Sequence, residues 1–193
     1  RSLQVANKLK DYHITLFGSS LHNLSDIGDN TDVVHLPLDV EQADNNISLQ
    51  QRELSTLHYA PILISGIRER AAIITNAFKN LYPLILVVDV SVEITMLARL
   101  SGIPTIVIMQ HGKRVDLAHL SAYESAEKLI APFSEDMYNG ENGWVKNKTV
   151  FTGGFSRFDG RMPVVKVIKK KIAILIGAGG TSIDSNVVNH IAL

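Results

Sequence analysis

The chain has 193 residues and a formal net charge of zero, with 46% hydrophobic and 20% charged residues. This composition is ordinary for a globular protein with one sizeable core and part of another, and it lacks the basic excess typical of nucleic-acid binding. Cysteine is absent, which excludes disulfide frameworks, thiolate nucleophiles and cysteine-ligated zinc. No apolar run approaches the roughly 18–20 residues that span a bilayer, so we expect a cytoplasmic protein.

Helical and strand patterns alternate from the first residues onward. Apolar residues at helical spacing predict a helix near residues 1–12, and short apolar runs predict strands within residues 13–20 and 32–39. Residues 39–47 are polar and loop-like. Helices are predicted over residues 48–60 and 66–82.

The alternation continues through the middle of the chain. Residues 83–91, "PLILVVDVS", form a nearly continuous apolar run, which is typical of a strand buried on both faces of a parallel sheet. Ser91 can cap the next helix, which should close at Gly102. A strand over 103–110, a helix over 116–126 and strands over 128–133 and 149–154 complete the pattern. It predicts an α/β fold with a doubly wound parallel sheet, Rossmann-like, over residues 1–154.

The character of the sequence changes after residue 154. Residues 155–170 are rich in basic side chains and are interpreted as an interdomain linker. Residues 171–193 begin with the apolar run and glycine turn "IAILIGAGG", and a helix is predicted from about Thr181. This is the pattern of the first β-turn-α unit of a second α/β domain.

Ligands of open α/β sheets bind outside the carboxyl ends of the strands, and two such ends carry candidate residues. Asp89 can receive a proton or cap the following helix. The loop "QHGKRVD" offers the donors, acceptors and imidazole of Gln110, His111, Arg114 and Asp116. His111 is the candidate general base, although such a loop can also simply be solvated. His58 and His119 fall in predicted helices and are assigned structural or surface roles.

The glycine turn "GAGGTS" can bring backbone N–H groups and a helix N-terminus up to a phosphate. Gly177 and Gly179 match the first two positions of a dinucleotide fingerprint, but Ser182 occupies the third. No lysine follows the glycines, so this is not a Walker loop. The motif predicts phosphate binding without naming the ligand.

The order of these features resembles the GT-B glycosyltransferases, near the branch that includes the UDP-N-acetylglucosamine transferase of peptidoglycan synthesis. "RSLQVANKL" is similar to the helix after their glycine-rich first loop, and residues 89–133 resemble the paired strand-helix units that end their N-terminal domain. "FTGGFSRF" followed by "IAILIGAGGTS" resembles the domain crossover and the first donor-binding loop. Where the peptidoglycan enzyme has His-Glu-Gln-Asn, this chain has "MQHGKRVD", so the acceptor need not be the same.

The resemblance implies an acceptor-side domain that lacks its first strand, together with the start of a donor-binding domain. It implies transfer of a sugar from a UDP-linked donor, with Gly177, Gly179, Gly180 and Thr181 on the diphosphate. Gln110, His111, Arg114 and Asp116 would face the acceptor, a small molecule, glycan or lipid-linked hydroxyl. No metal or cofactor and no nucleic acid is expected. We also expect these 193 residues alone to be inactive.

Three functions remain open at this point. The first is glycosyl transfer, and the second is hydrolysis or 2-epimerisation of a nucleotide-sugar on the same fold. The third is a non-catalytic α/β binding module. A lipid-linked acceptor would bring peripheral contact with the inner face of a membrane, which the basic residues 166–171 would suit, although a solvated linker explains them equally.

Overall fold

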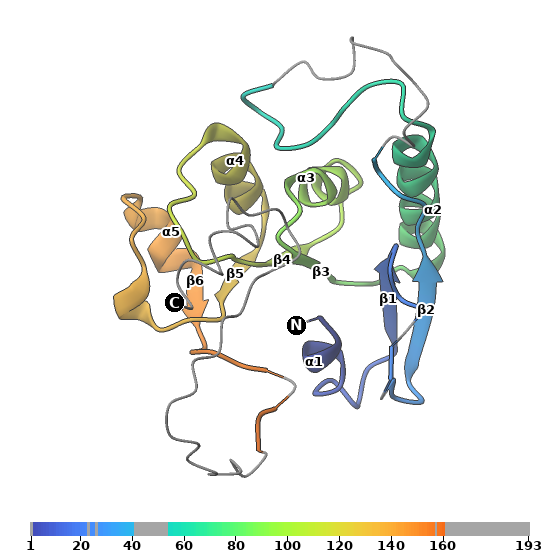
Figure 1. The fold of residues 1–193 in the computed structure, drawn as a ribbon, viewed down its shortest axis with the longest axis horizontal. Helices are drawn as coiled ribbons and strands as arrows, with labels where there is room; N and C mark the ends of the chain where they lie inside the picture. Colours follow the sequence, from blue (N-terminus) through green and yellow to red (C-terminus); the bar gives the residue numbers. More distant parts are fainter. Residues whose placement is uncertain (1, 23, 26, 41–53, 157, 161–193) are drawn as a thin grey trace, which may run out of the picture. The chain divides into compact units, whose positions relative to one another are not determined.

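The structure is a computed structural model that describes residues 2–22, 24–25, 27–40, 54–156 and 158–160. The chain divides into two compact units, residues 1–159 and 160–193, and nearly all described residues belong to the first. Figure 1 labels the elements. The helices are α1 (Ser2–Ala6), α2 (Ser65–Leu81), α3 (Val92–Leu100), α4 (Leu117–Ser125), the 3-10 turn η1 (Glu135–Met137) and α5 (Gly143–Lys148). The strands are β1 (Ile14–Gly18), β2 (Thr31–His35), β3 (Leu86–Asp89), β4 (Thr105–Ile108), β5 (Lys128–Ala131) and β6 (Thr149–Phe151).

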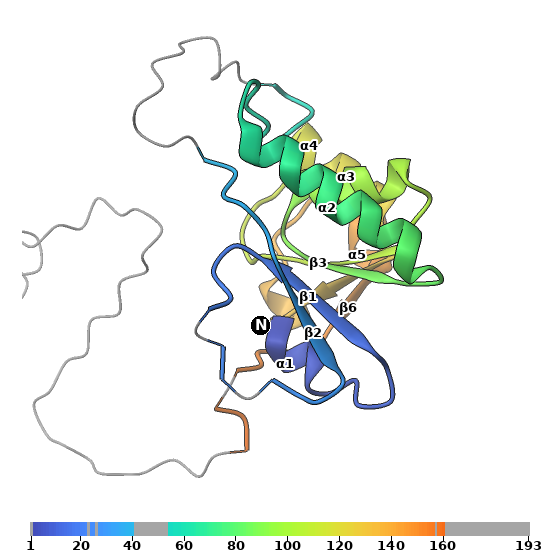
Figure 2. The ribbon, with the colours of Figure 1, turned by 90° about the vertical axis from the view of Figure 1, so that its right-hand side faces the viewer.

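All strand pairings in the described residues are parallel, which confirms the predicted α/β class. β1 pairs with β2, and the other four strands form a sheet in the order β3-β4-β5-β6. The described strands therefore form two sheets rather than the single sheet predicted. In Figure 2, α2, α3 and α4 lie side by side above β3, and α1 lies below it.

The predicted start and end of α3 are confirmed, at Ser91 and at Gly102. The Ser91 hydroxyl accepts from the Ile94 N–H at 3.3 Å and caps the helix. At the other end, Gly102 adopts a φ of +72°, and the N–H groups of Gly102 and Ile103 donate to Arg99 and Ala98. This is the Schellman arrangement, in which the left-handed residue is most often glycine. Ile103 then packs against Ala98 in the core, so the turn also directs the chain into β4.

Two expectations about the first half are wrong. Residues 54–60 contain no helix, although a helix was predicted over 48–60; residues 48–53 lie outside the described part. Only Val88 of β3 is buried, and Val87 is 37% exposed, so β3 is not covered on both faces. Within the described residues β3 lies at the edge of its sheet, whereas β4 lies between two strands and buries three of its four residues.

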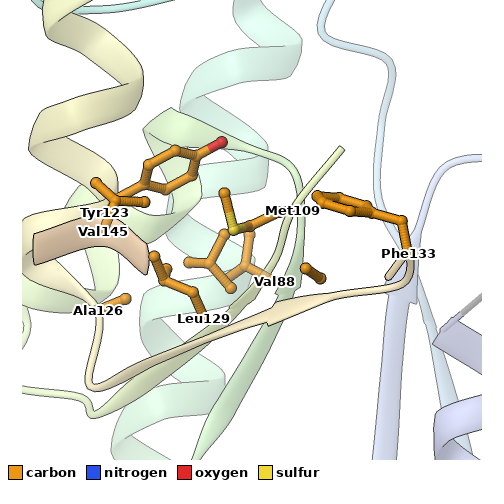
Figure 3. Close-up of a cluster of buried hydrophobic side chains, with 9 residues drawn as sticks. Val88, Met109, Tyr123, Ala126, Leu129, Phe133 and Val145 are labelled. Atoms are coloured by element: carbon orange, nitrogen blue, oxygen red, sulfur yellow. The ribbon is translucent and has the colours of Figure 1, made fainter. Parts of the chain in front are cut away.

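Two of the three hydrophobic clusters in the described residues join the sheets to their helices. The larger one joins the four-stranded sheet to α4 and α5, and Figure 3 shows Val88, Met109 and Leu129 gathered between Tyr123 and Phe133. The second joins α2 and α3 to residues next to both sheets, including Leu36 after β2 and Leu86 of β3. The α2 side chains Ile74 and Phe78 are the buried contributors from the helix, so α2 connects the two sheets through a shared core.

Burial at β5 gives a direct test of this core. Leu129 has no exposed surface, so Leu129→Ala should lower the free energy of unfolding by about 2–5 kcal/mol, the usual cost of deleting a buried leucine. Leu100→Ala is the matched control, because Leu100 is 85% exposed and its truncation should change stability by less than about 0.5 kcal/mol. Urea unfolding measures both. Equal effects of the two substitutions would contradict the described packing.

Candidate functional site

The carboxyl ends of three neighbouring strands meet at one edge of the four-stranded sheet. Asp89, the last residue of β3, is in register with Ile108 of β4, which is in register with Ile130 of β5. Because these strands are parallel, the loops that follow them leave the sheet on the same side. Helices α3 and α4 also begin here, so this edge combines two helix N-termini with polar loops.

Side-chain contacts fix the loop between β4 and α4, residues 109–116. The Arg114 Nη2 donates to the Gln110 Oε1 at 2.8 Å, and the Lys113 ammonium pairs with the Glu141 carboxylate. Gly112 has a φ of +125°, a conformation that residues with a Cβ rarely adopt, so glycine suits this turn. Two of the residues predicted to face an acceptor, Gln110 and Arg114, are thus brought into direct contact.

His111 is exposed and its ring is held from two sides. Its Nε2 lies 3.2 Å from the Met137 carbonyl oxygen, and its ring packs edge-on against Phe133 with centroids 5.2 Å apart. A carbonyl oxygen can only accept, so the hydrogen bond requires the proton on Nε2. In the neutral ring Nδ1 then carries the lone pair. The geometry therefore allows His111 to act as a base through Nδ1.

Asp116 has two roles within α4. Its carboxylate accepts from the His119 backbone N–H at 3.0 Å as the helix cap, and it also accepts from His119 Nδ1 at 2.8 Å. Burial alone would raise the pKa of Asp116, but the side-chain and backbone hydrogen bonds from His119 outweigh it and lower the pKa below its usual value. His119 is buried, which matches the structural role assigned to it.

Asp89 lies at the end of β3, exposed, and its Oδ2 accepts from the Ser2 hydroxyl of α1 at 3.4 Å. The capping role considered for Asp89 belongs to Ser91. Between them, Val90 has a φ of +75°, which is a strained conformation for a β-branched residue. Strained residues of this kind cost roughly 1–3 kcal/mol and cluster at binding and catalytic sites.

Sequence reasoning missed the partners of Glu93, in the first turn of α3. Its carboxylate oxygen accepts from the backbone N–H groups of His58 and Tyr59, at 2.7 and 2.6 Å. The His58 ring, placed wrongly in a helix, lies instead in this loop and meets His119 edge-on at 5.2 Å. An acidic residue just after a cap is a signal for contacts with N–H groups, but it does not indicate which distant loop supplies them.

The remaining predicted site residues lie outside the described residues. These are the donor-side Gly177, Gly179, Gly180 and Thr181, and the basic residues 166–171 lie there as well. Within the described part, no group of three or more His, Asp or Glu side chains is arranged to hold a metal ion. None of the helices described is both long and apolar enough to cross a membrane.

Comparison with known proteins identifies no family for this chain. The sequence matches no protein-family model and no curated protein. The candidate site therefore rests on the residues and contacts at the carboxyl edge of the sheet.

The lowered pKa of Asp116 predicts a pH-dependent stability. A carboxylate whose pKa is depressed by folding stabilises the folded state above its unfolded pKa, and this contribution is lost as the pH falls through the folded pKa. Asp116→Asn keeps a capping oxygen but removes the charge beside His119. We expect the variant to be less stable than the wild type at pH 7, with a difference that shrinks as the pH falls below about 4.

Two further variants sharpen this test. Asp116→Ala also loses the cap and should cost about 1 kcal/mol more than Asp116→Asn. Asp136→Asn, in the exposed turn η1, is the control and should change the free energy of unfolding at pH 7 by less than about 0.5 kcal/mol. Urea unfolding from pH 7 to pH 3 gives the free energies. A wild-type minus Asp116→Asn difference that stays constant over this range would contradict the charge interaction.

Proposed function

We propose that this chain belongs to a glycosyltransferase of the GT-B type that moves a sugar from a UDP-linked donor to an acceptor hydroxyl. The observation that carries the proposal is the polar loop 109–116, fixed at the carboxyl edge of a parallel α/β sheet. The glycine turn at residues 177–182 supports it from the sequence, since backbone N–H groups and a helix N-terminus are suited to a diphosphate.

The proposed reaction assigns one role to each group. Nδ1 of His111 removes the proton from the acceptor hydroxyl, and that oxygen attacks the anomeric carbon of the sugar. The bond from that carbon to the diphosphate oxygen breaks, and the diphosphate leaves with the bonding electrons. The N–H groups of the turn at Gly177, Gly179, Gly180 and Thr181 stabilise the negative charge that develops there.

Other residues at the edge of the sheet position the acceptor. Gln110 and Arg114 offer hydrogen-bond donors in the same loop as His111, and Asp116 fixes the start of α4 at the end of that loop. Asp89 ends the neighbouring strand and is a second carboxylate able to hold an acceptor hydroxyl. The acceptor is a small molecule, a glycan or a lipid-linked sugar, and the last of these would bring the protein to a membrane surface.

The base assignment predicts a selective loss of turnover. On the full-length protein, His111→Gln should lower kcat by about 10²–10⁴-fold while UDP-sugar binding stays unchanged, because the imidazole acts on the acceptor. His13→Gln, which removes an exposed imidazole just before β1, is the control and should leave kcat unchanged. An unaffected kcat in His111→Gln would remove His111 from the mechanism.

Product analysis separates transfer from the other reactions of nucleotide-sugars. Incubation with UDP-N-acetylhexosamine should release UDP only when an acceptor is present, and the sugar should then be found on that acceptor. Release of free sugar without acceptor would indicate hydrolysis, and an epimerised sugar would indicate a 2-epimerase. Absence of both binding and turnover with all common nucleotide-sugars would favour a non-catalytic binding module.

A further inference from the structure

One described segment lies entirely outside the hydrophobic core. Residues 54–63, the strap, contain no helix or strand, and none of their side chains is buried. The large apolar side chains among them are exposed, namely Leu54, Tyr59, Ile62 and Leu63. A segment that buries so little apolar surface gains little of the free energy that holds a loop against its domain. The position of the strap therefore depends on a few specific contacts.

One carboxylate anchors the middle of the strap. Glu93 Oε1 accepts from the backbone N–H groups of His58 and Tyr59, at 2.7 and 2.6 Å. Hydrogen bonds to a charged acceptor are roughly twice as strong as those between neutral groups. Because Glu93 lies in the first turn of α3, this contact ties the strap to the start of that helix. Figure 1 shows the strap, in turquoise, passing over α3 toward α4.

A second contact joins the strap to α4. The ring of His58 meets the ring of His119 edge-on, with centroids 5.2 Å apart. His119 is buried, and its Nδ1 donates to the Asp116 carboxylate at 2.8 Å. Asp116 is the last residue of the loop 109–116, which carries the predicted acceptor-side residues. A continuous series of side-chain contacts therefore runs from the strap to this loop.

The end of the strap next to α2 has a strained backbone. Leu63 has a φ of +68°, a left-handed conformation that leucine rarely adopts. The next residue, Ile64, is buried and is the N-cap of α2, so the packed part of the chain begins immediately after Leu63. Leu63 is therefore the point at which the strap can turn, and a change of its φ would relieve the strain.

We propose that the strap is a conformational device at the carboxyl edge of the sheet, with Glu93 as its latch and Leu63 as its hinge. In the structure it is closed over the starts of α3 and α4. Breaking the two hydrogen bonds to Glu93 opens it while the sheet and helices stay folded. Only its role in catalysis rests on the proposed transferase function: the closed strap steadies Asp116, and with it the acceptor side, through His119.

Hydrogen exchange of the 193-residue chain at low concentrations of urea tests the opening. We expect the amides of His58 and Tyr59 to exchange at least about a hundredfold faster than those of β4. Their rates should not depend on urea, because opening of the strap exposes little surface, whereas the rates in β4 should rise with urea. Exchange at the strap that is as slow as in β4 and rises as steeply with urea would overturn the proposal, since the strap would then open only on global unfolding.

Variants assign the latch to Glu93. Glu93→Ala removes the acceptor and should speed exchange at His58 and Tyr59 by at least about tenfold, whereas Glu93→Gln keeps an oxygen but loses the charge and should speed it less. Glu69→Gln, on an exposed carboxylate of α2, is the matched control and should change these rates less than about twofold. The amides of β4 report global stability in every variant. Unchanged strap exchange in Glu93→Ala, or equal acceleration of the strap and β4 in both Glu93 variants, would contradict the latch.

Turnover separates the strap from the proposed function. In the full-length protein, Glu93→Gln should raise KM for the acceptor found by product analysis at least about threefold and change kcat less than about twofold, because it loosens the acceptor side and not the reacting groups. A KM unaffected by both Glu93 variants would reject the role of the strap in transfer. Absence of transfer by the wild type, together with faster strap exchange in Glu93→Ala, would reject the proposed function and support the strap.

Discussion

The parallel pairing of β4 with both β3 and β5 is the constraint on which the candidate site depends. This register brings Asp89, Ile108 and Ile130 to one level of the sheet, so the chain turns into α3 and α4 at the same edge. Burial of Val107, Ile108 and Leu129 holds the strands in that register. A shift by one residue would move these side chains to the opposite face, so packing and site geometry are linked.

Contacts outside the sheet then give the loops their shape. Glu93 holds the loop at His58 and Tyr59, Asp116 caps α4, and Lys113 ties the loop after β4 to Glu141. Of these residues, Glu93 lies in the first turn of α3 and Asp116 caps α4. Polar side chains at this edge therefore serve the fold as well as any ligand. His111 differs because its contact with Met137 leaves Nδ1 available.

Local signals predicted much of the described fold. The apolar run of β4, the Ser91 cap and the Gly102 turn depend on neighbouring residues, and all three were predicted correctly. The helix expected over residues 48–60 was wrong where it can be checked, because Glu93, 34 and 35 residues away in sequence, fixes the loop at Tyr59 and His58. η1 and α5 were missed because three and six residues give too short a periodic pattern.

The candidate site could be predicted only in part, because it too depends on contacts between residues far apart in the sequence. The sequence places Gln110, His111 and Arg114 after a strand, but it does not show that Phe133 and Met137, from later in the chain, contact His111. Arg114 Nε is buried without a hydrogen-bond partner among the described residues, and this depends on packing rather than on residue type. The central claim is that ligands bind at the carboxyl edge of the four-stranded sheet. The measurement that tests this claim most directly is amide-shift mapping of the full-length protein with a UDP-sugar and an acceptor.

This mapping gives distinct results for the two ligands. The account predicts that UDP-sugar shifts residues 177–182, and that the acceptor shifts residues 109–116. Shifts confined to other surfaces, such as the β1–β2 sheet, would contradict it.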